Sequence, residues 1–286
     1  MFVALGLIGA FVAAVLVVAI HSFTSFDLSS FSLFFVVPVG AIVTGGLGTL
    51  GYYLGVLKTN IKITKAIKWT GIVIALVCFI LVQYGFYYTA YLDENMDLNF
   101  KMQGEHISLY AIGESDEPIN FFTFTQEMVN SRVISFSRRG RQLFEVEGNK
   151  VVNWIFYLVD FLGVLLGAFF ARFLVIGNKK YCDNCKRYMK QKDLLKFSVQ
   201  DTERVIRFKN ITQMQPQEIS ALVHSDGIPV EGEHYDIHLD WCKECNAGFI
   251  QLKYMELDSK NKPSHNEGKS IEIPVDSKVT QAILQQ

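Results

Sequence analysis

The sequence has few charged residues. Asp, Glu, Lys and Arg together make up 19% of its 286 residues, whereas soluble domains carry roughly 25%. The deficit is uneven, because hydrophobic residues, which make up 50% of the chain, gather in runs longer than a soluble core of this size requires. The composition therefore predicts a membrane protein with a modest soluble portion.

The sequence also has few prolines, no low-complexity tract and a net charge close to zero. The chain has only 6 prolines and no low-complexity tract, which leaves little room for long disordered segments. Its formal net charge is −1, so the chain as a whole offers no broad electrostatic attraction for nucleic acid. We therefore expect its partners to be the lipid bilayer and other proteins, and not nucleic acid.

The common catalytic motifs are missing from the sequence. There is no H-E-x-x-H, no G-x-S-x-G, no G-x-x-x-x-G-K-[ST] and no glycine fingerprint for a dinucleotide. The 6 histidines are scattered, and none has a carboxylate and a nucleophile at a spacing that argues for catalysis. We therefore expect that the protein is not an enzyme.

Four apolar stretches are long enough to cross a membrane. A helix needs roughly 20 mostly apolar residues to span the hydrocarbon core. The first stretch lacks a basic n-region and a small-residue cleavage site, so we interpret it as a span and not as a signal peptide. The pattern predicts an α-helical transmembrane bundle of four spans. These stretches are residues 1–20, 31–57, 69–91 and 152–176.

Basic residues indicate the direction of the spans. Residues 21–30 hold no Lys or Arg, whereas basic residues follow the second span and gather again at 179–196, after the fourth span. Short loops rich in Lys and Arg stay in the cytoplasm. We therefore predict a multipass protein of the cell inner membrane with both termini cytoplasmic and with residues 21–30 and 92–151 outside.

The chain is expected to divide into membrane, outer and cytoplasmic parts. Within the outer loop, residues 119–125 and 132–147 are interpreted as strands, with a hairpin turn near 138–141. This pattern predicts a small extracytoplasmic domain of β or α+β class. The expected parts are transmembrane helices 1–3 at 1–91, the outer loop domain at 92–151, transmembrane helix 4 at 152–176 and a cytoplasmic domain at 177–286.

Small residues follow one face of two spans. In the second span the small residues fall within about 80° of one another at 100° per residue. Such stripes let helices pack closely in a membrane. They fit either packing within one chain or a self-association face of a homo-oligomer, which includes a channel-lining version. The residues are Gly40, Thr44, Gly48, Gly51 and Gly55, and in the fourth span Gly163, Gly167 and Ala171.

Two polar side chains lie inside the apolar spans. A carboxylate such as Asp160 is costly if it is unpaired in lipid, so it should face the bundle interior or water. At about 1.5 Å per residue, Gln83 and Asp160 lie at similar depths, roughly 21 Å and 22–24 Å from the cytoplasmic ends of their helices. We hypothesise that the two side chains meet, either in a structural hydrogen bond or as part of a hydrophilic path.

Four of the 5 cysteines form two C-x-x-C pairs, Cys182 with Cys185 and Cys242 with Cys245. Two such pairs complete a closed tetrahedral Zn²⁺ site, which would hold the fold and leave no open position for catalysis. About 56 residues separate the pairs, against roughly 15–20 in the compact pattern. The sequence therefore predicts a zinc-ribbon-like α+β domain with a structured insertion. Two independent redox dithiols are the alternative, although no β-α-β pattern surrounds either pair.

The tail also carries patterns of regular structure around these pairs. A short helix is expected at residues 216–224, and strands are expected at 235–241 and 248–257, on either side of the second cysteine pair. The last stretch predicts a strand at 271–275 and then a helix at 277–285, capped by Asp276 or Ser277.

Two segments of the second span and the cysteine pair after the fourth span form a characteristic layout. The segments are Pro38-Val39-Gly40-Ala41-Ile42 and Gly51-Tyr52-Tyr53-Leu54-Gly55. With them, the chain resembles uncharacterised bacterial multipass membrane proteins that have a cytoplasmic zinc-ribbon-like domain. The resemblance covers mainly residues 31–57 and 150–190, and it implies an architecture but no function.

These features favour two functions of different classes. The first is an oligomeric membrane scaffold or sensor whose zinc-stabilised cytoplasmic domain docks a partner protein. The second is a membrane effector that forms a regulated pore or leak, as in a bacterial defence or toxin system. A transporter ranks third, because the chain shows no inverted repeat and no matched pair of broken helices. A redox enzyme ranks fourth.

Overall fold

The computed structural model describes most of the chain as two compact units. The first unit comprises Met1–Thr59 and Ile63–Gly177, and the second comprises Asn60–Lys62 and Asn178–Gln286. The described residues are 1–33, 37–111, 117–131, 133–138, 141–147, 149–177, 179–223, 232–259 and 262–285, with the backbone alone at 133–138 and 141–147.

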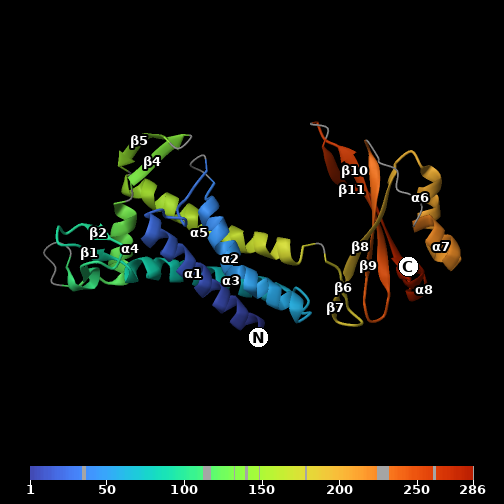
Figure 1. Cartoon of the computed structure of the whole chain (residues 1–286), viewed down its shortest axis with the longest axis horizontal. Coiled ribbons are helices and arrows are strands. Elements are labelled where there is room, and N and C mark those ends of the chain that lie inside the picture. Colours follow the sequence, from blue (N-terminus) through green and yellow to red (C-terminus); the bar gives the residue numbers. More distant parts are fainter. Residues whose placement is uncertain are drawn as a thin grey trace. The chain divides into compact units, whose positions relative to one another are not determined.

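Long helices form the main part of the first unit (Figure 1). Among the described residues, four helices are long and apolar enough to cross a membrane, which confirms the predicted number of candidate spans. α2 is the most buried of the four, because it packs along both α1 and α5 more extensively than any other pair of these helices packs. The helices are α1 (Phe2–Thr24), α2 (Val39–Lys58), α3 (Lys65–Tyr88) and α5 (Lys150–Val175).

The second and third helices begin at other residues than predicted. α2 begins at Val39 and not near residue 31, because Pro38 disfavours a helical conformation at Val37. α3 begins at Lys65, where the Thr64 hydroxyl caps the helix by accepting a hydrogen bond from the Ile67 N–H. The length of an apolar run therefore locates each helix, but local capping and proline chemistry set its ends.

Glycines bring α2 and α5 into backbone contact. A Cβ atom on Gly45 would lie 2.0 Å from the carbonyl oxygen of Val164, and one on Gly167 would lie 2.1 Å from the carbonyl oxygen of Ile42. Both distances are far below van der Waals contact. Any side chain at these positions would push the two helices apart, which is why small residues are needed here.

The small-residue stripe of the second span faces other parts of the same chain. Thr44 is buried, and its hydroxyl donates to the Gly40 carbonyl oxygen at 2.8 Å. On α5, Gly163 approaches Pro38, and Ala171 is buried. These contacts correspond to packing within one chain. The closest neighbours of the stripe glycines are Leu28 for Gly40, Cys78 for Gly48, Leu5 for Gly51, and Leu5 and Phe2 for Gly55.

The segment between α3 and α5 holds several short elements. β1, β2 and β3 form a small antiparallel sheet in the order β2-β1-β3. β4 and β5 pair as the predicted hairpin, although its turn residues 139–140 lie outside the described residues. The elements are β1 (Tyr91–Leu92), β2 (Leu98–Asn99), β3 (Glu105–His106), η1 (Ile107–Leu109), α4 (Phe121–Asn130), β4 (Val133–Arg138) and β5 (Arg141–Glu147).

The prediction of a strand at residues 119–125 is wrong, because Phe121–Asn130 form the helix α4. The aromatic and β-branched residues of this segment favour a strand locally. However, the Asn120 side chain caps a helix by accepting hydrogen bonds from the N–H groups of residues 122 and 123. Phe124 and Val129 are then buried on one side, so capping and tertiary burial override the local propensity.

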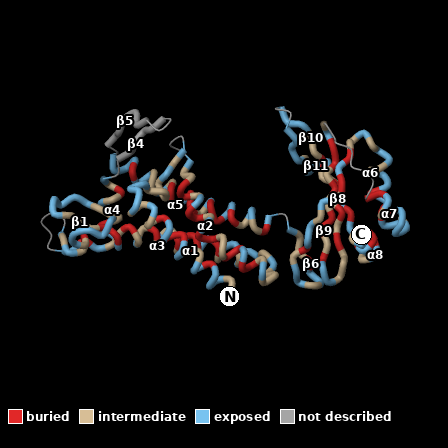
Figure 2. Tube along the Cα trace, viewed as in Figure 1, coloured by how far each residue is buried: buried red, intermediate tan, exposed pale blue. Residues whose placement is uncertain are grey.

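A four-stranded antiparallel sheet forms the centre of the second unit, in the order β11-β10-β9-β8. Figure 1 shows α6, α7 and α8 on one side of this sheet, and the buried residues in Figure 2 run along its strands. The elements are β8 (Lys190–Ser198), α6 (Thr202–Lys209), η2 (Ile211–Gln213), α7 (Pro216–Val223), β9 (His234–Trp241), β10 (Gly248–Leu257), β11 (Pro263–Val275) and α8 (Ser277–Leu284).

Alternate residues of the sheet build a hydrophobic core with the helices. Ile237, Leu239, Ile250 and Leu252 are buried against side chains of α6, α7 and α8, including Phe208. This unit therefore has a core of its own. The alternation also explains why β9 and β10 are recognisable in the sequence.

The predicted elements of the tail are largely confirmed. β9, β10, α7 and α8 occur where expected, and the Asp276 side chain caps α8 by accepting a hydrogen bond from the Val279 N–H at 3.0 Å. β8 and α6 are not anticipated by the sequence patterns. β11 begins at Pro263 and not at residue 271. Residues 263–266 pair with β10, but the segment 263–270 is polar and lacks apolar alternation, so the sequence does not reveal this part of the strand.

Candidate metal centre

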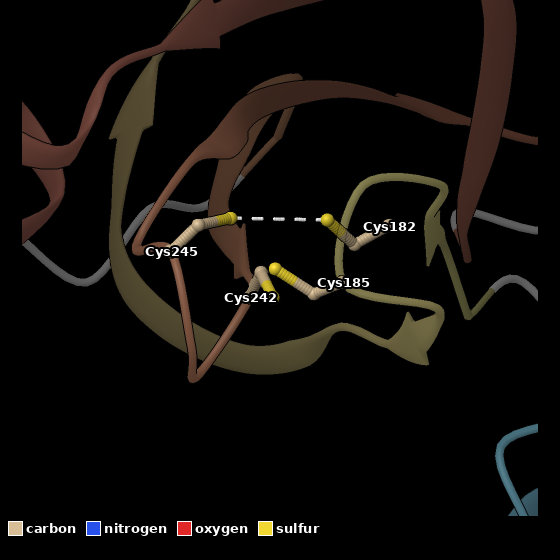
Figure 3. A group of neighbouring side chains, drawn as sticks. All are labelled: Cys182, Cys185, Cys242 and Cys245. Atoms are coloured by element: carbon tan, nitrogen blue, oxygen red, sulfur yellow. Dashed lines mark hydrogen bonds between the residues drawn. The ribbon is translucent and has the colours of Figure 1, made fainter.

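Each cysteine pair lies at the turn of a β-hairpin. Cys182 ends β6 (Tyr181–Cys182), and Cys185 lies in the turn before β7 (Arg187–Tyr188). Cys242 directly follows β9, and Cys245 lies in the turn before β10. The two turns meet, so that the four thiols point toward one another (Figure 3). Among the described residues, this is the only group of three or more possible metal ligands.

The spacing of the sulfur atoms fits a tetrahedral metal. All four Sγ atoms lie within 4.8 Å of one another, and those of Cys182 and Cys245, from different hairpins, are 3.8 Å apart. A tetrahedral site with metal–sulfur bonds of about 2.3 Å requires sulfur–sulfur distances near 3.8 Å. The four cysteines are therefore compatible with one metal site, and their convergence disfavours two independent dithiols.

The two turns share a backbone feature that the sequence pattern does not reveal. The residue after the second cysteine of each pair, Lys186 or Asn246, has a positive φ of 53° or 55°. In the second turn, the Asn246 N–H donates to the Cys242 carbonyl oxygen at 2.9 Å. The left-handed residue turns the chain back after the second cysteine, and this brings both sulfurs of a pair to the same side.

The thiols influence one another electrostatically. Burial favours the neutral form of Cys242, but hydrogen bonds from the backbone N–H groups of Cys245 and Glu244 outweigh it and lower its pKa to about 7. The hydrogen bond with Cys245 raises the pKa of Cys185 to about 12, and burial raises that of Cys182. A divalent cation would supply the positive charge that lets all four groups act as thiolates.

The first hairpin also holds the loop between α2 and α3. The Tyr181 hydroxyl donates to the Asn60 carbonyl oxygen at 3.1 Å, and the Tyr188 hydroxyl donates to the Ile61 carbonyl oxygen at 2.9 Å. The Tyr188 N–H donates to the Asn60 Oδ1 at 3.2 Å. These bonds place Asn60–Lys62 in the second unit, more than a hundred residues from their partners in the sequence.

An ion pair completes the contact between this loop and the hairpin. The Lys62 ammonium lies 2.5 Å from the Asp183 carboxylate. Asp183 directly follows Cys182, between the two cysteines of the first pair. A second ion pair, Arg187 with Glu244 at 2.6 Å, joins the two hairpins. Both pairs are about half exposed, so we expect them to contribute orientation more than stability.

The two polar residues of the spans lie in the first unit. Asp160 on α5 and Gln83 on α3 both line a cavity of about 270 Å³, together with His21 and Asp27. Asp160 is 7% exposed. The structure thus places both residues at one cavity, and their direct contact stays a prediction. The fifth cysteine, Cys78, is buried in α3 and donates to the Thr44 carbonyl oxygen at 3.9 Å.

Comparisons of the chain with models of protein families, with curated proteins and with solved structures found no match. The resemblance to bacterial multipass proteins with a zinc-ribbon-like domain therefore stays a prediction.

Proposed function

We propose that this protein is a scaffold or sensor of the bacterial inner membrane, in which Zn²⁺ stabilises the cytoplasmic domain and that domain docks a partner protein. Four thiolates are soft ligands, and a tetrahedral set of four thiolates is typical of structural zinc. All four ligand positions would be taken by cysteine, so the metal would have a structural role. The separate hydrophobic core of the second unit supports a domain whose surface serves a partner.

The double role of the first hairpin carries this proposal. It holds two of the four converging cysteines, and it also holds the loop between two candidate spans through Tyr181 and Tyr188. Metal binding would order the hairpin, and the ordered hairpin would fix the loop. The state of the metal centre would in this way reach the membrane helices, as a sensor requires.

The same contact supports the proposed topology. Asn60–Lys62 and the tail belong to one compact unit, so the loop between α2 and α3 and the tail would lie on the same side of the membrane. The positive-inside pattern predicts this arrangement with both regions in the cytoplasm. Homo-oligomer formation would use another surface than the α2 stripe, because that stripe packs within the chain.

Tyr188→Phe is expected to loosen the loop without removing the metal. The lost hydroxyl bonds the Ile61 carbonyl oxygen, and one hydrogen bond is worth about 1 kcal/mol, so we expect trypsin to cleave after Lys62 about five-fold faster. The zinc content should stay at about one ion per chain. Mass spectrometry of fragments from the full chain in detergent measures both rate and site.

A matched control is Tyr235→Phe, which removes a hydroxyl from the same domain and should leave this cleavage rate unchanged. In the wild type, a zinc chelator should accelerate the same cut. If the chelator removes the metal and leaves cleavage after Lys62 unchanged, then the loop does not respond to the metal, and the sensor proposal fails.

The cavity at Asp160 favours a second function, a membrane effector that forms a regulated pore or leak. Carboxylates at Asp160 and Asp27, with Gln83 and His21, give this cavity a polar wall within an otherwise apolar bundle. Intramembrane acids commonly belong to ion or proton paths. Conduction along such a path would depend on the negative charge of Asp160.

Asp160→Asn tests this second function. If the protein conducts, induced expression of the wild type should depolarise the cell membrane, and the variant should abolish the depolarisation at equal membrane abundance. Potential-sensitive dyes and growth curves provide the measurement. Equal potentials in uninduced, wild-type and variant cells would rule out the effector and leave the scaffold.

A further inference from the structure

A long groove lies between α1 and α3, separate from the metal centre and from the cavity at Asp160. It has a volume of about 810 Å³, and its walls are mainly apolar and aromatic. Phe11, Tyr88 and Phe23 line it and are 59%, 61% and 85% exposed. Such side chains in the first unit would face lipid if the four helices cross a bilayer, and the inference below rests on that crossing.

The length of the groove corresponds to one leaflet of a bilayer. Along α1 it is lined from Phe11 to Phe23, and these 12 steps of about 1.5 Å span roughly 18 Å. Half of the hydrocarbon core is about 15 Å thick. The groove therefore reaches from about the middle of the membrane to one headgroup region, which is the extent of a single acyl chain.

A glycine shapes the floor of the groove. Gly85 of α3 lines it, and a Cβ atom there would lie 2.5 Å from Cγ2 of Val18 on α1. The missing side chain lets α1 and α3 approach each other closely at this point of the groove. The result is a channel for a chain-like apolar group between two rigid helices.

The lining of the groove becomes polar at one end. Ser22, Thr89, Lys101 and Gln103 line this end, and Lys101 is the single charged residue among the described residues of the lining. Its side chain is exposed, and within the described part of the chain it forms no ion pair. A cation at the headgroup end of an apolar groove is complementary to an anionic amphiphile.

The turn that carries Lys101 is held by Asn99. The Asn99 Oδ1 accepts hydrogen bonds from the N–H groups of Lys101, at 3.1 Å, and Gln103, at 3.4 Å. The Asn99 Nδ2 donates to the Gln103 carbonyl oxygen at 2.9 Å. The ammonium is thus presented from a hydrogen-bonded turn of defined conformation, which favours selective binding over a transient contact.

We propose that this groove binds one phospholipid with an anionic headgroup. An acyl chain lies along Phe11 and Val15, and the phosphate group pairs with the ammonium of Lys101. A basic residue near an anionic lipid headgroup contributes about 1 kcal/mol, which corresponds to about a five-fold preference over a zwitterionic lipid. The site is independent of the metal centre, so its failure would leave the zinc proposal intact.

Native mass spectrometry of the full chain tests the site. The protein is purified in detergent and given equal amounts of phosphatidylglycerol and phosphatidylcholine with identical acyl chains. We expect the wild type to retain one phosphatidylglycerol in about five-fold preference. Lys101→Gln should lose the preference, while Lys68→Gln, which removes an exposed lysine from the other end of α3, should keep it.

Val15→Trp fills the apolar part of the groove from an exposed position, and it should abolish retention of both lipids without lowering the melting temperature. An unchanged lipid ratio in Lys101→Gln overturns the headgroup contact. If Val15→Trp retains as much lipid as the wild type, the retained lipid is bulk annular lipid, and the proposal that the groove binds it is overturned. Displacement of the lipid by soluble glycerol phosphate at the same concentration would assign the site to a free anion and also overturn the proposal.

Discussion

Cys242→Ser is expected to empty the proposed metal centre and unfold the second unit. Cys242 is fully buried, and its N–H donates to the Ala247 carbonyl oxygen at 3.0 Å across the second turn. Structural zinc contributes about 10–16 kcal/mol of apparent binding free energy to small domains. That amount exceeds the whole stability of many domains, about 5–15 kcal/mol. The loss of one ligand is therefore expected to have a very large effect.

Elemental analysis and limited proteolysis measure this outcome. We expect the zinc content to fall from about one ion per chain to near zero, and the tail to become sensitive to protease. Cys78→Ala is the matched control, because Cys78 is buried in α3 and is not one of the four converging cysteines. It should retain the metal.

A Cys242→Ser protein with its full zinc content would contradict a four-sulfur site. A wild-type protein without metal that cycles between dithiol and disulfide would instead support the redox alternative. A disulfide between Cys182 and Cys245, whose sulfurs are neighbours from different hairpins, would join the two turns.

Gly45→Ala is expected to destabilise the helix bundle, whereas Gly46→Ala should not. The added Cβ at Gly45 would lie 2.0 Å from the Val164 carbonyl oxygen, but the nearest atom at Gly46 is the Gly167 carbonyl oxygen at 3.6 Å, an ordinary contact. Overpacking of this kind costs about 1–3 kcal/mol or more. The change from glycine to alanine otherwise favours a helix by about 1 kcal/mol.

These two variants control for each other, because they make the same chemical change one residue apart on the same helix. Thermal unfolding of the purified protein in detergent should show a lower melting temperature for Gly45→Ala and an unchanged or higher one for Gly46→Ala. Equal melting temperatures would mean that α2 and α5 do not approach each other at Gly45 as closely as the structure shows.

The sequence alone determined the features that depend on neighbouring residues. Long apolar runs predict the four spans because a helix must bury about 20 residues in lipid. The two C-x-x-C pairs predict their own convergence because one tetrahedral metal needs four ligands. The alternation in β9 and β10 shows which side of each strand is buried, and Asp276 marks the start of α8 because a capping carboxylate acts within three residues.

The tertiary structure decided what depends on contacts between distant segments. Residues 119–125 look like a strand, but burial of Phe124 selects a helix. The small residues of α2 cannot reveal whether they face the same chain or another copy, and only the approach of α1, α3 and α5 answers this. The physical reason is that propensity and periodicity are local, whereas packing depends on which surfaces meet.

The loop at Asn60–Lys62 and the groove at Lys101 illustrate this limit best. Asn60 binds Tyr181 through its backbone carbonyl, and every residue type has that group, so no sequence pattern marks the contact. The groove is formed by two helices and a turn whose residues carry no shared motif. Both features arise because folding brings ordinary groups together, and their chemistry exists only in that arrangement.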